Sequence, residues 1–381
     1  MHFFNACREK CDGNKKDCDE KDLLAFFIIV LSHYNTKDAM NRIRKYIDVD
    51  PLILTISPTH KCTSSCENCC FGCNPQIDYI MDYGTMTKHI DEALDEYTTI
   101  QILVLTGGEC FLLGDTLVRI IRYATNKGLK TRVVTNGHWA NTYESALSRL
   151  EPLVNAGLCE INFSTGDEHA KFVSPENIVN AVLASKELGV QTIIISVESP
   201  EDAKLSSSYF KNHPILGDFI SKKQVGCIDA SWISFKQEKE AYRPGLQSLN
   251  RRPCDNIFKG LYINPYSQLL SCCGLTVEYN KFLKLGDLEK HCIRDLYEKQ
   301  FDDLFKLWLF LEGPMVIYEK VMMHQNKAPK SLSHECAYCM ELVRDLANIN
   351  TISEIIQNEM PGLLFNYKIA NSKFIIKQKK H

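Results

Sequence analysis

The sequence predicts an α/β fold in which a partial (β/α)6 barrel is followed by a C-terminal extension. Between residues 51 and 240, six short apolar runs rich in β-branched residues alternate with stretches of helical periodicity. Alternation of this kind produces a parallel sheet. Six strand–helix units fit a partial barrel of the TIM type better than a closed eightfold one. Beyond residue 240 the alternation weakens and new cysteines appear.

The expected strands lie at residues 52–56, 100–105, 130–134, 160–163, 190–197 and 228–235. Helices are expected at residues 86–97, 115–126, 142–151 and 174–189, and two more before the barrel at 21–34 and 36–47. The helix near residue 175 has Ser174 as its N-cap and Pro175 in its first turn. Because the chemistry of such barrels lies in the loops after the strands, polar residues at strand ends are the candidates for a site.

Four segments are expected along the chain. Residues 1–50 form an N-terminal helical extension, and residues 51–245 form the barrel. Residues 246–345 form the cysteine-bearing region, and residues 346–381 form a C-terminal helix with a basic tail. The boundary after the barrel is placed around Arg243-Pro244-Gly245, where the strand–helix pattern ends.

Composition excludes several classes of protein. A net charge of −3, with 45% hydrophobic and 24% charged residues, is that of an ordinary soluble protein. This charge gives no support for a nucleic-acid or membrane partner. The apolar run Leu23–Leu31 is too short for a bilayer, which needs about 20 residues, and no signal-peptide cleavage site follows it. A cytoplasmic protein is therefore expected.

The 17 cysteines are the unusual feature of the composition. Clustered thiols in a long chain indicate a metal or catalysis in a reducing compartment. Cys62, Cys66 and Cys69 follow the first expected strand with the spacing C-x3-C-x2-C. Thiolates in one short loop can converge on a cuboidal iron–sulfur cluster, and three of them leave the fourth iron without a protein ligand. A zinc site is the alternative, which Cys70 and Cys73 keep open because structural zinc takes four ligands.

This motif, directly after a first strand, resembles the signature of the radical S-adenosylmethionine (SAM) superfamily, and the resemblance spans residues 50–240. It implies a [4Fe–4S] cluster whose open iron binds SAM. An electron from the reduced cluster then cleaves the C5′–S bond of SAM, and the 5′-deoxyadenosyl radical abstracts hydrogen from a substrate. The family usually has an aromatic residue before the third cysteine. Here Asn68 stands there, Phe71 is the candidate replacement, and Cys70 remains an alternative ligand to Cys69.

The same resemblance assigns residues at later strand ends. Gly107-Gly108-Glu109 follows the second strand and is expected to bind the SAM amino group, since glycines permit close backbone approach and a carboxylate suits an ammonium. Asn136 after the third strand faces the same site. Ser164 and Asp167 after the fourth are expected to contact the ribose or carboxylate of SAM, with turn formation as the alternative. His169 is expected to be a surface or capping residue, and no catalytic residue is assigned.

A second group of cysteines follows the barrel. Cys254, Cys272, Cys336 and Cys339 provide four thiols, enough for one closed cluster. Residues 260–272 resemble the hairpin that leads to a cluster ligand in the SPASM and shorter Twitch extensions of the family, with Ser267 where glycine is usual. The resemblance implies one auxiliary [4Fe–4S] cluster, with a zinc site as the alternative. Alternative ligands are Cys273, Cys292 and His334, and a third metal site at Cys7, Cys11 and Cys18 is not favoured.

These features predict a radical SAM oxidoreductase that modifies or crosslinks a ribosomally made peptide. The resemblance implies an electron donor such as a flavodoxin or ferredoxin, and an auxiliary cluster that accepts the electron left on the substrate. The runner-up is a radical SAM dehydrogenase or rearrangement enzyme acting on a small molecule or a protein side chain. A non-catalytic iron–sulfur or zinc protein is the alternative of another class, and Glu109 argues against it because a structural metal needs no carboxylate for a SAM amine.

Overall fold

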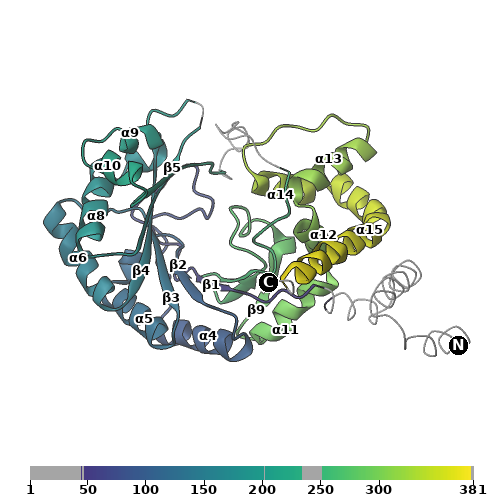
Figure 1. Ribbon diagram of the computed structural model, residues 1–381, viewed down its shortest axis with the longest axis horizontal. Coiled ribbons are helices and arrows are strands. Elements are labelled where there is room, and N and C mark those ends of the chain that lie inside the picture. Colours follow the sequence, from purple (N-terminus) through teal and green to yellow (C-terminus); the bar gives the residue numbers. More distant parts are fainter. Residues whose placement is uncertain (1–43, 45–46, 201, 234–250, 379–381) are drawn as a thin grey trace, which may run out of the picture.

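The structure is a computed structural model that describes residues 44, 47–200, 202–233 and 251–378, with side-chain surroundings given up to residue 371. The two helices expected at 21–34 and 36–47 and the boundary expected around residue 243 lie almost entirely outside this range. Within it, the predicted α/β fold with a partial barrel is confirmed (Figure 1).

The described residues form one sheet of nine strands in the order β6-β5-β4-β3-β2-β1-β7-β8-β9. Strands β1 to β6 run parallel to their neighbours. Figure 1 shows them in an arc, with α4, α5, α6 and α8 along its outer side. All six predicted strands are present, at Ile53–Ile56, Ile102–Leu105, Lys130–Thr135, Leu158–Gly166, Thr192–Glu198 and Gly226–Ala230.

The four predicted barrel helices are also present, as α4 (Tyr83–Glu96), α5 (Asp115–Asn126), α6 (Tyr143–Asn155) and α8 (Pro175–Glu187). The Ser174 side chain accepts a hydrogen bond from the backbone N–H of Glu176 and so caps α8 as predicted. Shorter helices also occur within the barrel, namely η1 (Cys110–Leu113), α7 (Asp167–Ala170), α9 (Ser207–Lys211) and α10 (Leu216–Ser221).

The C-terminal region adds three strands to the same sheet. Strand β7 (Gly260–Ile263) pairs in parallel with β1, and β8 (Gln268–Leu270) and β9 (Lys284–Asp287) continue antiparallel. The predicted hairpin is therefore confirmed, whereas the pairing of β7 with β1 was not predicted. Ser267 in the hairpin turn has a φ of 54°. Glycine adopts this left-handed conformation at the lowest cost, which explains why it is usual at this position.

Helices complete the C-terminal region beside β9 (Figure 1). Among the described residues, no helix combines the length and the apolar character needed to span a membrane. The remaining elements are η2 (Lys281–Leu283), α11 (Ile293–Glu298), η3 (Lys299–Asp302), α12 (Leu304–Leu311), α13 (Pro314–His324), α14 (Glu335–Arg344) and α15 (Leu346–Gln378).

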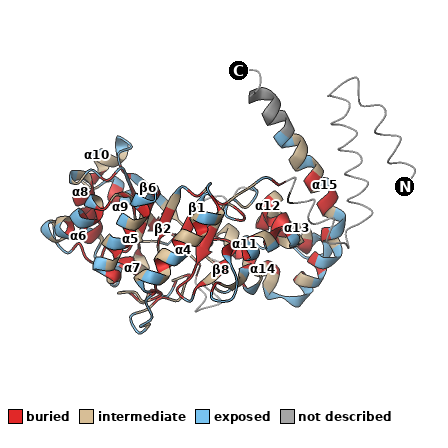
Figure 2. Ribbon diagram, turned by 90° about the horizontal axis from the view of Figure 1, so that it is seen from below, coloured by how far each residue is buried: buried red, intermediate tan, exposed pale blue. Residues whose placement is uncertain are grey.

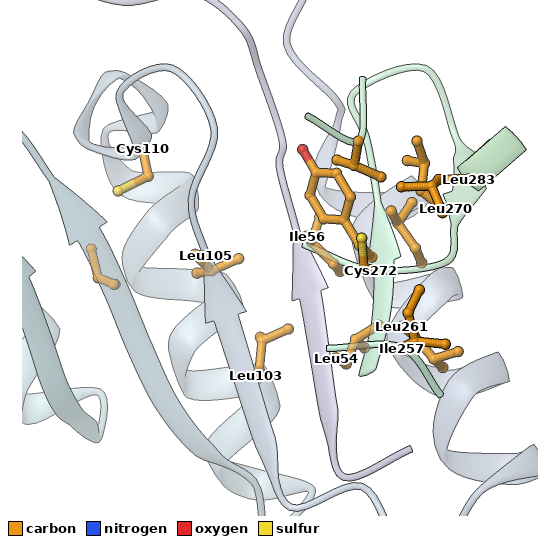
Figure 3. Close-up of a cluster of buried hydrophobic side chains, with 14 of the residues drawn as sticks. Leu54, Ile56, Leu103, Leu105, Cys110, Ile257, Leu261, Leu270, Cys272 and Leu283 are labelled. Carbon is orange, nitrogen blue, oxygen red and sulfur yellow. The ribbon is translucent and has the colours of Figure 1, made fainter. Parts of the chain in front are cut away.

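The hydrophobic core is continuous from the barrel into the C-terminal region. Buried residues extend from the strands of the barrel to α12 and α13 (Figure 2). Leu54 and Ile56 of β1 are fully buried, with Leu103 of β2 on one side and Leu261 of β7 on the other (Figure 3). Since burial of apolar surface contributes about 25 cal/mol per Å², the shared core ties the two regions together.

This continuity predicts that Leu261→Ala destabilises the barrel as well as the hairpin. Loss of a buried leucine side chain costs about 2–5 kcal/mol. Urea unfolding followed in single-tryptophan variants, with Trp139 reporting on the barrel and Trp308 on the C-terminal helices, should show both signals shifting together. Leu346→Ala, at a side chain that is 74% exposed, should change stability by less than about 0.5 kcal/mol. A shift confined to the Trp308 signal would contradict a shared core.

Candidate cofactor site

A cavity of about 390 Å³ lies inside the barrel, lined by residues of its strands and of the loops at their carboxyl ends. Its volume is within the range of ligand pockets, about 300–1,000 Å³. Successive side chains of a strand point to opposite sides of a sheet, so alternate residues of the first four strands form its wall. They are Ile53 and Thr55, Val104 and Thr106, Arg132 and Val134, and Asn162 and Ser164.

The thiols of Cys62, Cys66 and Cys69 line one side of this cavity. Burial raises the pKa of Cys62 to about 11, and the charges of Glu109 and Cys69 raise it further. Burial also raises the pKa of Cys66 to about 12, with contributions from Cys69 and Cys62. Three thiols this close together are costly to ionise without a cation among them. A cluster in which each thiolate ligates its own iron fits this arrangement.

The GGE segment packs against the backbone that leads into the cysteine loop. The N–H of Gly108 donates to the carbonyl of Thr59 at 2.8 Å, and the N–H of Glu109 donates to the carbonyl of Lys61 at 2.9 Å. A Cβ atom on Gly108 would lie 1.9 Å from the Lys61 carbonyl oxygen, so only glycine permits this approach. Gly107 and Gly108 also line the cavity.

The Glu109 carboxylate lies away from the cavity wall. It is fully buried and accepts hydrogen bonds from the Thr135 hydroxyl at 2.8 Å, the Asn136 N–H at 2.8 Å and the Phe111 N–H at 3.0 Å. Burial raises the pKa of Glu109 to about 7, and these hydrogen bonds oppose the shift. These hydrogen bonds make the carboxylate an anchor between the ends of β2 and β3.

Asn136 connects this anchor to the cysteine loop. Its side chain lines the cavity, and its Nδ2 donates to the Thr63 hydroxyl at 3.0 Å, the Ser64 hydroxyl at 3.4 Å and the Cys62 sulfur at 3.6 Å. Its Oδ1 accepts the N–H of His138 at 3.0 Å, which fixes the orientation of the amide. Asn136 therefore contacts the cysteine loop directly, in addition to facing the cavity as expected.

Ser164 and Asp167, the two site residues expected after β4, have different surroundings. Ser164 lines the cavity, whereas the Asp167 carboxylate accepts the backbone N–H groups of Lys204 and Leu205, each at 2.8 Å. Asp167 thus holds the loop after β5, which is the turn-forming role that the sequence left open. Ser164 keeps the position expected for a residue that contacts a ligand.

His169 was expected at the surface or as a cap, and the structure places it in the cavity wall instead. Its side chain is only 7% exposed, and its Nδ1 has no hydrogen-bond partner among the described residues. Burial lowers the pKa of His169 to about 4, so the imidazole is neutral near pH 7. The ring packs edge-on against Trp232, with centroids 4.6 Å apart. A neutral imidazole with a free nitrogen can accept or donate one hydrogen bond to a ligand.

Sequence reasoning missed several other wall residues. Arg132 and Asn162 face the cavity from β3 and β4, and Arg132 forms an ion pair with Glu160 at 2.7 Å. The polar pair Asn162 and Ser164, spaced by two within one strand, was a signal that could have revealed this wall. Phe71 lines the cavity, as expected for the residue that replaces the usual aromatic side chain.

The four cysteines of the C-terminal region interact electrostatically with one another. A Cβ on Gly274 would lie 3.0 Å from the Cys336 sulfur and 3.4 Å from the Cys272 sulfur, so both thiols share one small space. After burial, the charge of Cys254 is the largest cause that raises the pKa of both Cys272 and Cys336. Cys339 interacts in the same way with Cys336 and Cys254. In the described part of the chain, no three His, Cys, Asp or Glu side chains are placed to hold a single metal ion.

The alternative ligands have different surroundings. Cys273 lines the large cavity, Cys292 is exposed at the start of α11, and the Nδ1 of His334 accepts the N–H of Cys336 at 3.0 Å. Cys70 is buried, and the charges of Cys69 and Cys336 raise its pKa, so it lies near one member of each cysteine group. The backbone N–H of Cys73 donates to the Cys69 sulfur at 3.3 Å. Cys7, Cys11 and Cys18 lie outside the described residues.

The anchoring role of Glu109 predicts that Glu109→Ala destabilises the protein even without iron or SAM. At about pH 5 the group is mostly protonated, so the substitution mainly leaves buried donors unpaired, at about 1–3 kcal/mol each. Because the pKa is raised in the folded state, the stabilising effect falls as the pH rises from about 5 to about 7. Urea unfolding of iron-free protein across this range measures both effects. The exposed Glu151→Ala variant serves as the control, and equal stability of the two variants would remove Glu109 as an anchor.

No protein-family model matches the chain. The "Putative peptide biosynthesis protein YydG" of Bacillus subtilis (strain 168) is 22% identical over 306 residues, which span 78% of this chain and 93% of that protein. The fold also resembles that of Streptococcus suis SuiB bound to S-adenosylmethionine, with 14% identity, a TM-score of 0.44 and 77% of each chain covered. It resembles native anSMEcpe with bound AdoMet and Cp18Cys peptide, with 13% identity, a TM-score of 0.44 and 81% of this chain and 98% of that chain covered.

In the chain, the C-x3-C-x2-C motif follows β1 and the GGE segment follows β2. Both reach the same cavity at the carboxyl ends of a parallel, partial barrel. This arrangement is the one that the resemblance of the two motifs to the radical SAM signature implies.

Proposed function

We propose that the protein cleaves SAM reductively and uses the radical chemistry to modify a ribosomally made peptide. The observation that carries this proposal is that one cavity of about 390 Å³ has the cysteine loop, the GGE glycines and Cys273 of the C-terminal region in its wall. A reacting ligand and a substrate residue can therefore meet in one cavity.

Cys62, Cys66 and Cys69 would hold the SAM-binding [4Fe–4S] cluster. When bound, the cluster and SAM supply a 5′-deoxyadenosyl radical that abstracts hydrogen from a substrate. Gly107 and Gly108 present close-packed backbone to the cavity, which suits contact with the polar groups of SAM.

The wall beyond the cysteine loop would orient the ligand and keep water out. Asn136 and Ser164 offer polar groups along it, and Phe71 and Trp232 supply apolar surface. Glu109 would act indirectly. Its carboxylate accepts the backbone N–H of Asn136, and the Asn136 side chain donates to Thr63 of the cysteine loop.

Cys254, Cys272, Cys336 and Cys339 would hold a second, auxiliary [4Fe–4S] cluster of the Twitch kind. The electrostatic interactions among these four thiols, of which Cys272 and Cys339 are buried, support this assignment over scattered core cysteines. A second cluster suits an oxidoreductase, because a cluster can take up an electron, and an external donor such as a flavodoxin or ferredoxin would supply electrons to the first cluster.

A peptide substrate is supported by the relative from Bacillus subtilis, which is named as a putative peptide biosynthesis protein and is matched over nearly its whole length. The test is anaerobic reconstitution with iron and sulfide, followed by mass spectrometry of short peptides encoded near the gene. A change in peptide mass that requires both SAM and a reductant supports the proposal. SAM-dependent turnover of a small molecule, with all such peptides unchanged, would contradict the peptide substrate.

Replacing Cys62, Cys66 and Cys69 together with alanine is expected to abolish 5′-deoxyadenosine production. The unmodified protein should hold about eight irons, four in each cluster, and the variant about four. Liquid chromatography and iron analysis measure the two quantities. A control variant that lacks Cys159 and Cys227, two cysteines outside both groups, should keep about eight irons and normal SAM cleavage. Undiminished cleavage in the first variant would rule out the assigned ligands.

Replacing Cys336 and Cys339 with alanine is expected to remove about four irons and leave SAM cleavage partly intact. Modification of the peptide should stop, since the second cluster is then missing. Iron analysis, 5′-deoxyadenosine and peptide mass are measured on one sample, with Cys159→Ala/Cys227→Ala as the control. A folded variant that holds only four irons and still makes full product would show that the second cluster has no part in the reaction.

A further inference from the structure

The side-chain amide of Asn280 contacts one thiol of the second cysteine group, which consists of Cys254, Cys272, Cys336 and Cys339. The residue is fully buried, and its Nδ2 donates to the sulfur of Cys339 at 3.7 Å. Its Oδ1 accepts the N–H of Phe282 at 3.1 Å at the start of η2. Because the oxygen is committed to that N–H, the NH2 group is the part of the amide that faces the sulfur.

The Cys339 sulfur, which accepts this hydrogen bond, lies close to other cysteines of the group. Cys339 is buried, and the charges of Cys336 and Cys254 both act on it. A similar contact occurs at the barrel cysteines, where Asn136 donates to Cys62 at 3.6 Å. The Nδ2 of Asn136, however, also reaches the hydroxyls of Thr63 and Ser64, whereas Cys339 is the one acceptor recorded for the Nδ2 of Asn280 among the described residues.

We propose that Asn280 is a positioning residue that raises the reduction potential of the second cluster through its hydrogen bond to the Cys339 thiolate. This inference rests on the proposed auxiliary cluster. One electron added to a cluster increases the negative charge on its sulfur ligands, and an N–H donor stabilises that reduced form more than the oxidised one. Hydrogen bonds from groups outside the ligand set tune metal sites in this way. A raised potential favours a cluster that receives electrons.

The test uses full-length protein that lacks Cys62, Cys66 and Cys69, so that only the second cluster gives a paramagnetic signal. Two variants are made in this background. Asn280→Ser keeps a hydroxyl that can cap η2 but is too short to reach the sulfur. Asn280→Asp keeps the capping oxygen and replaces the donor with a second oxygen. A redox titration followed by electron paramagnetic resonance gives the potential, and iron analysis gives the cluster content.

Asn264→Ser is the matched control. Asn264 is also fully buried and also caps a turn, since its Oδ1 accepts the N–H groups of Tyr266 and Gln268, each at 3.1 Å. Its NH2 group donates to Gln268 and Glu278, and among the described residues it donates to no cysteine. It therefore reproduces the structural loss of the Asn280 variants without the contact to sulfur.

Both Asn280 variants are expected to keep about four irons and to have a lower potential than their background. At a fixed potential, the ratio of reduced to oxidised cluster should fall about tenfold, which is about 59 mV for one electron. The control should keep the background potential. An unchanged potential in iron-loaded Asn280 variants overturns this inference alone. Loss of iron in both Asn280 variants but not in the control would show a purely structural role for Asn280 and would also overturn the inference. A background protein that holds no iron would overturn the second cluster and this inference together.

Discussion

The burial of the Glu109 carboxylate between the ends of β2 and β3 is the interaction on which the site depends. A buried carboxylate without partners would cost several kcal/mol, and the three donors around Glu109 offset that cost. These bonds fix the backbone of Asn136, whose amide in turn binds the cysteine loop. From the other side, the glycine at position 108 packs against the carbonyl of Lys61. The loop that carries the three cysteines is thereby held from two neighbouring strands before any cofactor binds.

The second constraint is the pairing of β7 with β1. The cysteine loop follows β1 directly, and the hairpin that contains β7 leads directly to Cys272. Parallel strands place their carboxyl ends at the same edge of a sheet, so the two cysteine groups lie near each other. Cys70, which interacts with Cys69 and Cys336, marks the point where they approach. The common cavity, with Cys273 in its wall, follows from this pairing.

Local patterns in the sequence predicted what depends on local structure. The six barrel strands, the helix cap at Ser174 and the hairpin before Cys272 were all predicted, because alternation and turn residues are read from neighbouring positions. The direction of the Glu109 side chain was not, because it depends on which strand lies beside β2. The cavity position of His169 and the pairing of β7 were missed for the same reason, since each is set by residues distant in the sequence. The ligand assignments of the cysteines remain predictions that the chemistry of the protein must test.

The most direct test of the account is the electron paramagnetic resonance spectrum of reduced, reconstituted protein before and after addition of SAM with a ¹⁷O-labelled carboxylate. If Cys62, Cys66 and Cys69 leave one iron open to SAM, the spectrum should change on addition of SAM, and a hyperfine coupling to ¹⁷O should appear. The same spectrum with and without labelled SAM would contradict the account. It would mean that a fourth protein ligand, with Cys70 and Cys73 as the nearest candidates, closes the cluster.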